Sequence, residues 1–263
     1  MPPAPPRVWV ARTITQRQRS LATRHDIFCC GDGDGGEILE RCPAFRSAPH
    51  DRYDRRGTRH LGATYRRRDV ATARLIVARH VVNLPTGRIS QFLERPPAIV
   101  PGRRYAEPSR VALLASYQGT DLGKSIRLRL VGRLAETAMG LGYPHYLLTI
   151  RPVLFRSLSW LPWDLAPPIL YPSREGGPIK REPLWPCTLN LHELVAATKQ
   201  LRPHYYLQMF PDEPAWYDPT QVRSPEIIAD LAAANAQYVK DCMIRWEKGA
   251  RLLVLADTGY EVD

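Results

Sequence analysis

The chain has 263 residues, of which 44% are apolar and 24% charged, so its composition predicts one large or two small globular domains rather than a disordered chain. No apolar run approaches the ~20 residues that a membrane-spanning helix needs, and the first residues show no signal-peptide pattern. The five cysteines lack the spacing of a disulfide framework or a zinc site, which is typical of the reducing cytoplasm and predicts no metal centre.

The net charge of +11 lies entirely in the first part of the chain. Residues 1–110 hold 21 arginines and 10 acidic residues, whereas residues 111–263 hold 16 basic and 16 acidic residues. A basic surface of this kind attracts an acidic partner, which is a nucleic acid, an anionic membrane or an acidic protein. The arginine-rich, lysine-poor composition of a high-GC genome also explains part of the excess.

The first half of the chain mixes strands with irregular segments. After a proline-rich tail, the pattern predicts a strand over residues 8–11 and a helix over residues 13–28. Residues 31–36 are predicted to be a loop, because they lack the further ligands of a calcium-binding loop. Residues 58–80 predict a β-hairpin that turns at residues 66–69, and the proline-rich residues 84–105 predict irregular chain with a short helical piece.

The second half alternates strands with helices, predicted at residues 111–115, 124–141, 146–150, 152–160, 188–201, 227–247 and 251–255. Asn190 stands near the start of one helix, and Ser224 followed by Pro225 opens the longest one. This mixed order, rather than a regular alternation, predicts an α/β sandwich around a mixed sheet.

Several charged residues stand within or beside apolar runs. Arg74 lies inside the run TARLIV, and Glu107 and Arg110 precede the run VALLA. A buried guanidinium is costly unless carboxylates satisfy its donors, and Asp51, Asp54 and Glu107 are the candidates. Chemistry alone leaves two alternatives, which are an ion-pair network that only supports the fold and a pocket for a charged substrate.

The order and spacing of these residues resemble the signature of a known family. The residues concerned are Arg24 and Phe28 in RHDIF, Asp51 and Asp54, Arg74, Glu107 and Arg110. Together they resemble the autoinducer synthases, which make acyl-homoserine lactones and belong to the GNAT-like acyltransferases. The resemblance covers roughly 150 residues and ends near Trp163.

Two further segments resemble a sister group, the N-acyl amino acid synthases. One is DRYDRRGTRHL, in which His60 follows the aspartate pair, and the other is PPILYPSREGGPIKREP. The tryptophan that lactone synthases carry a few residues after the phenylalanine is absent, since Cys29 and Cys30 follow Phe28 here. These differences favour an amino acid over S-adenosylmethionine as the acceptor.

The stretch YQGTDLGKS resembles the GNAT loop that binds the pyrophosphate of coenzyme A. By this resemblance Gln118, Gly119 and Gly123 bind the phosphopantetheine of the donor, while Asp121 occupies the inner glycine position. A carboxylate there would repel a pyrophosphate, which favours acyl carrier protein, with its single phosphate, over coenzyme A. The alternative is a plain glycine turn between a strand and a helix.

The resemblance implies an α/β fold with a GNAT-like mixed β-sheet sandwiched by helices over residues 8–203, and a C-terminal extension over residues 204–263 with a long helix. It implies an acyltransferase that moves a fatty acyl chain from acyl carrier protein to a small amine. The acceptor is an amino acid or, alternatively, S-adenosylmethionine as a co-substrate in lactone synthesis, and no resident cofactor is needed.

The same resemblance assigns the roles within the site. Glu107 and Arg110 are the catalytic residues, with Glu107 relaying the proton of the attacking amine. The acceptor pocket consists of Arg24, Phe28, Asp51, Asp54 and Arg74. Backbone N–H groups of residues 111–116 are expected to stabilise the oxyanion if that strand is splayed from its neighbour.

The expected partner is acyl carrier protein, which is strongly acidic, and the exposed arginines at residues 66–68 and 103–104 are candidates to attract it. We expect a cytoplasmic enzyme that has no nucleic-acid partner. A more remote alternative is a basic nucleic-acid-binding protein without catalysis, but the chain shows no recognition helix and no aromatic–basic strand motif.

Overall fold

The computed structural model describes residues 5–29, 53–54, 57–91, 93, 95–171, 182–247 and 253–254. Their strands form a nine-stranded sheet in the order β1-β2-β3-β4-β5-β8-β7-β9, with β6 also paired to β8. The strands are β1 (Arg7–Val10), β2 (Arg59–Tyr65), β3 (Arg68–Val77), β4 (Tyr105–Leu113), β5 (His145–Ile150), β6 (Asp164–Leu165), β7 (Ile169–Tyr171), β8 (Glu182–Asn190) and β9 (Leu253–Val254). The sheet is mixed, as predicted, because β4–β5 and β7–β9 are parallel pairs and the others are antiparallel.

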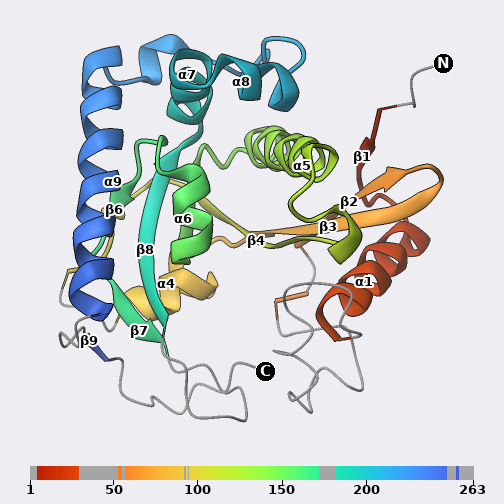
Figure 1. The fold of residues 1–263 in the computed structure, drawn as a ribbon, viewed down its shortest axis with the longest axis horizontal. Coiled ribbons are helices and arrows are strands. Elements are labelled where there is room, and N and C mark those ends of the chain that lie inside the picture. The colour runs from red at the N-terminus through yellow and green to blue at the C-terminus, as the bar shows by residue number, and fades with distance from the viewer. Residues whose placement is uncertain are drawn as a thin grey trace.

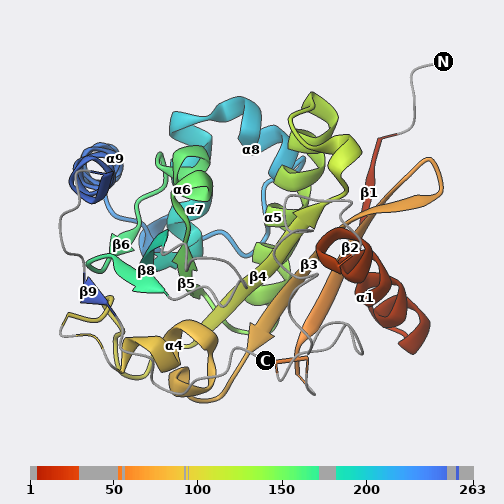
Figure 2. The ribbon, with the colours of Figure 1, turned by 60° about the horizontal axis from the view of Figure 1, so that its bottom comes forward.

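Helices cover both faces of this sheet (Figures 1 and 2). They are α1 (Ile14–Cys29), α4 (Pro85–Ser90), α5 (Asp121–Gly140), α6 (Pro152–Leu158), α7 (Leu191–Leu201), α8 (Pro203–Met209) and α9 (Pro225–Glu247). Helix α5 packs on one face of β3 and β4, and α1 packs on the opposite face. Within the described residues, none of the helices is both long and apolar enough to cross a bilayer.

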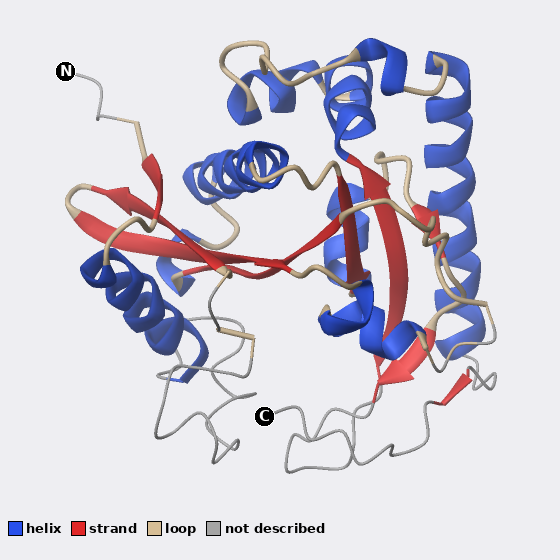
Figure 3. Cartoon of the chain, turned by 180° about the vertical axis from the view of Figure 1, so that it is seen from behind, coloured by secondary structure: helices blue, strands red, loops and turns tan. Residues whose placement is uncertain are grey.

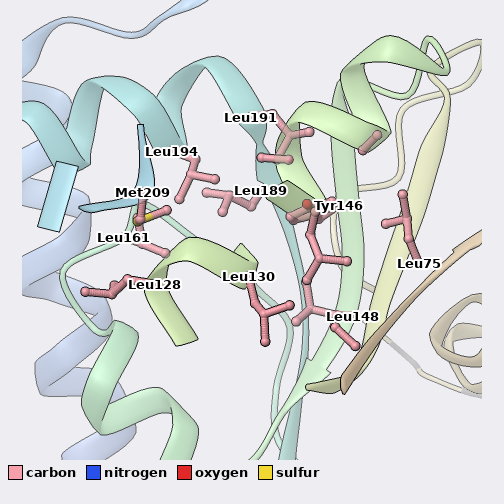
Figure 4. Close-up of a cluster of buried hydrophobic side chains, with 14 of the residues drawn as sticks. Leu75, Leu128, Leu130, Tyr146, Leu148, Leu161, Leu189, Leu191, Leu194 and Met209 are labelled. Atoms are coloured by element: carbon pink, nitrogen blue, oxygen red, sulfur yellow. The ribbon is translucent and has the colours of Figure 1, made fainter. Parts of the chain in front are cut away.

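The main core lies between the sheet and the layer of α5, α7 and α8. On α5 the buried positions Ile126, Leu130 and Leu134 recur every four residues, which places them on one side of the helix. Figure 4 shows Leu130 beside Tyr146 and Leu148 of β5, with residues of β8 and α7 above them. The apolar side of the helix that the sequence predicts is therefore the side that packs against the sheet.

Helix α5 begins three residues earlier than predicted. Thr120 is its N-cap, and the Thr120 hydroxyl accepts a hydrogen bond from the Gly123 amide at 2.9 Å. The glycine-bearing turn therefore leads directly into the helix at Asp121, which stands exposed in its first turn.

Strand β4 also begins earlier than predicted, at Tyr105 rather than near residue 111. Glu107 and Arg110 therefore lie within the strand rather than before it. Pro108 occupies an interior position of the strand, and this is the sequence feature that argued against extended structure there.

The hairpin of β2 and β3 is tighter than the predicted turn over residues 66–69. Tyr65 pairs with Arg68, so that only Arg66 and Arg67 form the turn. Both adopt positive φ, 47° and 65° respectively, as a two-residue hairpin turn requires. Arginine rarely adopts this conformation, which is why the sequence pattern indicated a longer turn.

Strand β8 was not predicted from the sequence, although it is a central strand that pairs with β5 over the full length of β5. Pro183 and Pro186 lie within it, and proline is usually excluded from the interior of a sheet because it lacks an N–H donor. The helix predicted from residue 188 consequently begins later, at Leu191, with Asn190 as its N-cap. The Asn190 side chain accepts a hydrogen bond from the His192 amide at 3.0 Å.

The segment after residue 204 is bonded to the part of the chain that precedes it. Arg223 donates from Nε and Nη2 to the two carboxylate oxygens of Glu193 in α7, each at 2.6 Å. The side chain of Asn235 in α9 donates to the main-chain oxygen of Trp163 at 2.7 Å. Helix α9 begins at Pro225, as its sequence signals predict, and the Ser224 hydroxyl accepts from the Ile227 amide at 3.4 Å.

Candidate active site

The parallel strands β4 and β5 separate almost as soon as they have met. Their register contains two pairs, Tyr105 with His145 and Ala106 with Tyr146, although β4 continues to Leu113 and β5 to Ile150. Figure 3 shows the consequence, since β2, β3 and β4 cross the molecule in one direction and β5 and β8 run steeply across it. Within the described residues, the β5-facing edge of β4 thus has no strand partner beyond Ala106, and we call the divergence of the two half-sheets beyond this pair the wedge.

A β-bulge interrupts β4 at the position where the wedge opens. Arg74 of β3 pairs with Ser109, and Thr72 pairs with Ala112. Between these two pairs β4 therefore contains one residue more than β3. Arg110 lies in this bulge with φ 54°, which an L-residue adopts only at a cost. Its guanidinium carbon lies 5.7 Å from the centroid of the Phe28 ring at the end of α1, so the bulge directs Arg110 toward α1.

Arg24, Asp54 and Arg74 form a buried ion cluster on the α1 face of the sheet. Each is at most 6% exposed. Arg24 donates from Nη1 and Nη2 to the two Asp54 carboxylate oxygens at 3.0 and 2.5 Å, and Arg74 Nη1 donates to Asp54 Oδ1 at 3.1 Å. One carboxylate thus serves two guanidiniums, and Arg74 Nε donates to the Ser109 hydroxyl at 2.9 Å. The structure therefore brings together three of the predicted pocket residues.

His60 lies beside this cluster because it pairs with Arg74 across β2 and β3. The side chain is 4% exposed, and its Nε2 atom is 3.7 Å from Asp54 Oδ1. Burial is the main reason why its pKa is lowered to about 4; the neighbouring Arg24, Arg17 and Arg74 add to this, and Asp54 opposes it. His60 is therefore neutral at pH 7.

Glu107 lies on β4 two residues before Ser109 and is 5% exposed. Its carboxylate accepts from the amide and the hydroxyl of Thr86, both at 2.9 Å, and so supplies the cap that the first turn of α4 lacks. Burial raises the pKa of Glu107 to about 8, although the Thr86 hydrogen bonds and the charge of Arg74 act in the opposite direction. A carboxylate with a pKa in this range exchanges protons near neutral pH, which is the property that a proton relay needs.

The predicted donor turn joins β4 to α5 beside the hairpin tip. The Gln118 side chain donates to the main-chain oxygen of Leu113 at 3.1 Å, and Gly119 has φ 71°. At Gly123 a Cβ atom would lie 1.8 Å from the Tyr117 main-chain oxygen, so only glycine fits there. The ring of Tyr117 stands edge-on to that of Tyr65, with 6.2 Å between the centroids.

Substitution of Gly123 by alanine is expected to destabilise the protein by roughly 1–3 kcal/mol, because the added methyl group overlaps main-chain atoms of the turn. The matched control is Gly140→Ala at the other end of α5, where a Cβ atom would meet no atom within 4 Å. The control should be neutral or slightly stabilising, since alanine is the better helix former. Urea unfolding of both variants checks the difference, and equal stabilities would contradict this account of the turn.

Sequence reasoning missed two residues of the site. Ser109, which is bonded to Arg74, and Thr86, which is bonded to Glu107, are not among the predicted site residues. Both contacts depend on the register between strands and on the position of α4, which no local pattern indicates. Asp51, which was expected beside Asp54, lies outside the described residues, as does the loop at residues 31–36.

No family model matches the sequence, and no curated protein sequence matches it. Solved structures do resemble it. FeeM, described as an N-acyl amino acid synthase from uncultured soil microbes, is 11% identical with a TM-score of 0.50, and the match covers 76% of this chain and 98% of FeeM. TofI, in a ternary complex with an inhibitor and MTA, is 14% identical with a TM-score of 0.51, over 73% of this chain and 96% of TofI. At such identities the likeness shows the fold, and it confirms the predicted GNAT-like α/β class.

Proposed function

We propose that the protein is an N-acyltransferase that transfers a fatty acyl group from a carrier-bound thioester to the amine of an amino acid. The observation that carries this proposal is the wedge between β4 and β5, because the same strand β4 is bonded to the buried charged cluster through Ser109 and to the donor turn through Leu113. The likeness in fold to FeeM, an N-acyl amino acid synthase, supports the same reaction class.

The reaction requires little covalent chemistry from the protein. The neutral amine attacks the thioester carbonyl carbon, the N–C bond forms, and the tetrahedral oxyanion then expels the thiolate as the C–S bond breaks. The N–H groups on the edge of β4 that no described strand pairs are suited to stabilise the oxyanion. Glu107 accepts the amine proton directly or through a water, and a proton returns to the leaving sulfur.

The acceptor binds on the α1 side of β4. Arg110 and Phe28 present a cation beside an aromatic ring, which suits the carboxylate and the carbon chain of an amino acid. Arg24 and Arg74 are held by Asp54, so they shape this pocket and set its potential. S-adenosylmethionine, which also carries an α-amino group and a carboxylate, is the alternative acceptor.

The donor side favours a carrier protein over free coenzyme A. Asp121 stands exposed in the first turn of α5, and the Gly123 amide is already bonded to Thr120. Both features weaken this helix end as a site for a pyrophosphate, whereas a phosphopantetheine arm brings one phosphate. The donor contacts proposed for Gln118, Gly119 and Gly123 belong to this arm.

The tip of the β2–β3 hairpin is placed to attract an acidic carrier protein. Arg66, Arg67 and Arg68 are exposed in succession, and the Arg66 guanidinium carbon lies 5.4 Å from the Tyr65 ring that contacts Tyr117 of the donor turn. The left-handed backbone conformation of Arg66 and Arg67 costs roughly 1–2 kcal/mol of stability at each residue. This strained turn holds three cations beside the donor turn. We assign acyl carrier protein to this surface as the docking partner.

An Arg66→Asn/Arg67→Gly variant should therefore be more stable than the wild type but bind the carrier protein more weakly. Asn-Gly is the preferred sequence for a turn with two positive φ values, so the free energy of unfolding should rise by about 1 kcal/mol. The loss of two cations should raise the KM for an acyl carrier protein donor roughly fivefold to tenfold at low salt, and leave the KM for acyl coenzyme A unchanged. Urea unfolding and steady-state kinetics with the two donors provide the measurements.

A Lys199→Asn variant is the matched control, because Lys199 is exposed and pairs with Glu213 away from the donor turn. Its KM for the carrier protein should equal that of the wild type. If the hairpin variant altered both donor KM values equally, or neither, the docking assignment would be wrong.

The proposed function is tested directly by incubating the purified protein with acyl carrier protein charged with C8 to C16 chains. Separate reactions contain each of the twenty amino acids or S-adenosylmethionine, and mass spectrometry detects the products. N-acyl amino acids that require the protein would support the proposal, and acyl-homoserine lactones would shift it to the alternative acceptor. Absence of any acylated product from either thioester donor, with a folded protein, would refute it.

A further inference from the structure

A hollow of about 570 Å³ lies apart from the wedge, at the start of α1. The ends of β1, the first residues of α1, the start of β2 and Thr137 of α5 form its walls. We call it the α1 hollow. The donor turn lies at the far end of β2, beyond the seven residues Arg59–Tyr65, which at ~3.3 Å per residue is roughly 20 Å away.

The described residues in the walls of the α1 hollow carry positive charge and include no acidic side chain. Arg12, Arg17 and Arg59 contribute three guanidiniums, and His60 forms part of the wall. The bonds recorded for two of these cations go to main-chain oxygens, from Arg17 Nη2 to Asp54 at 2.5 Å and from Arg59 Nη1 to Gly57 at 3.4 Å. Among the described residues none of the three forms an ion pair with a carboxylate.

Two buried nitrogen atoms at the α1 hollow lack a hydrogen-bond partner among the described residues. They are Arg17 Nε and His60 Nε2. His60 is 4% exposed, and its Nε2 atom lies 3.7 Å from the Asp54 carboxylate, which is too long for a hydrogen bond. Both atoms are shielded from solvent, so a ligand in the α1 hollow would act on them through its charge rather than through a direct hydrogen bond.

The end of α1 adds to the positive potential without supplying the contacts itself. Gln16 Oε1 accepts from the amides of Arg12 and Thr13 at 2.8 and 3.2 Å, and the Thr13 hydroxyl accepts from the Gln16 amide at 3.2 Å. The helix start is therefore already capped by its own side chains. The guanidiniums, rather than the helix amides, are the groups that remain to bind a ligand.

We propose that the α1 hollow is a binding site for a small organic anion that carries carboxylate or phosphate groups, separate from the donor and the acceptor of the acyl transfer. Planar guanidiniums bind both groups with paired hydrogen bonds, and three of them around one hollow match a ligand with more than one negative charge. The site does not depend on the acyltransferase activity, because its walls use neither the donor turn nor the wedge.

The site is connected to the charged cluster through Asp54. Arg17 bonds the main-chain oxygen of Asp54, and His60 lies beside its carboxylate. An anion held by Arg12, Arg17 and Arg59 would therefore alter the potential at the residue that binds Arg24 and Arg74. This connection gives the anion a physical route to the acceptor pocket.

The test is calorimetric titration of the full chain with citrate and, separately, with inorganic phosphate, at constant ionic strength. Saturable binding is expected, and an Arg12→Ala/Arg59→Ala variant should bind at least tenfold more weakly. Both arginines are outside the buried cluster, so the variant should fold, which circular dichroism checks. Arg133→Ala is the control, since Arg133 pairs with Glu136 on the surface of α5 and should leave the Kd unchanged.

A second readout is the ¹⁵N signal of the His60 imidazole during a pH titration. A bound anion favours the imidazolium, so the pKa of His60 should rise from its low value of about 4 when citrate is present and remain unchanged in the double variant. The two probes separate a carboxylate ligand from a phosphate ligand. Absence of saturable binding by either probe, or equal binding by the wild type and the double variant, would overturn the proposal.

Discussion

A Glu107→Gln variant should retain the fold and lose about 10²- to 10⁴-fold in kcat/KM, because the amide keeps the contacts to Thr86 but takes up no proton. The pH dependence of kcat/KM tests the role of Glu107 more specifically than the loss of activity does. The base is the ionised form of Glu107, whose pKa is about 8, and the acceptor amine must also lose a proton in this range. Below pH 8 the logarithm of kcat/KM should rise with a slope near 2 in the wild type and near 1 in the variant.

The free energy of unfolding should fall as the pH rises, whereas kcat/KM should increase. Glu107 has a higher pKa in the folded protein than in the unfolded chain, so the folded state holds its proton more firmly. Its contribution to stability is complete below the unfolded pKa of about 4.5 and is lost as the pH rises through about 8. The variant lacks this titration, and urea unfolding at pH 6 and pH 9 should show the stability of the wild type falling relative to it.

An unchanged slope in Glu107→Gln would assign the proton relay to another group. Thr86→Ala serves as the structural comparison, because it removes the hydroxyl contact to Glu107 and leaves the carboxyl group in place. If Thr86→Ala reproduced both the loss of activity and the change of slope, Glu107 would act by positioning α4 rather than by moving a proton.

Among the substitutions considered, Asp54→Asn should lower the free energy of unfolding most, by about 3–5 kcal/mol. It removes a carboxylate that Arg24 and Arg74 share, and leaves two guanidiniums buried without a counter-charge from Asp54. In a chain of this size such a loss lowers Tm by roughly 10 °C. Urea unfolding and thermal unfolding at pH 7 measure the change.

Asp69→Asn is the matched control for this substitution. Asp69 also receives two bonds from one arginine, Arg19, but the Arg19 side chain is 47% exposed. Water replaces a lost partner at an exposed pair, so the cost should be below about 1 kcal/mol. Similar losses in the two variants would show that the burial of the Asp54 cluster does not determine its contribution.

Much of the fold was predictable because its elements carry strong local signals. Helices α1, α5 and α9 have periodic apolar positions, α9 also has a recognisable start, and β2 and β3 are two apolar runs separated by a polar turn. The pairing of Arg74 with Asp54 was also predictable, because a guanidinium inside an apolar strand requires a carboxylate nearby, whereas Arg24 was expected beside them only from the family resemblance. These predictions depend on local periodicity or on the cost of an unpaired charge.

The remainder depends on interactions between distant segments. The prolines of β8 oppose strand formation locally, but the strand forms because β5 and β7 pair with it on either side. The bulge at Arg110 appears only when β4 is placed against β3, and the contact of Thr86 with Glu107 only when α4 is docked on β5. No pattern within a single segment indicates any of these.

The short junction between β4 and β5 has a consequence for how such an enzyme diversifies. Two residue pairs join the half-sheets, so the angle between them is set by the side chains packed on either side rather than by a ladder of hydrogen bonds. Tyr146 and Leu148 on β5 belong to that packing, and a change in their volume alters the width of the wedge without breaking a backbone bond. Under the proposed function, an acyl chain bound in the wedge would be exposed to such changes, so that single substitutions in the core would alter the preferred chain length.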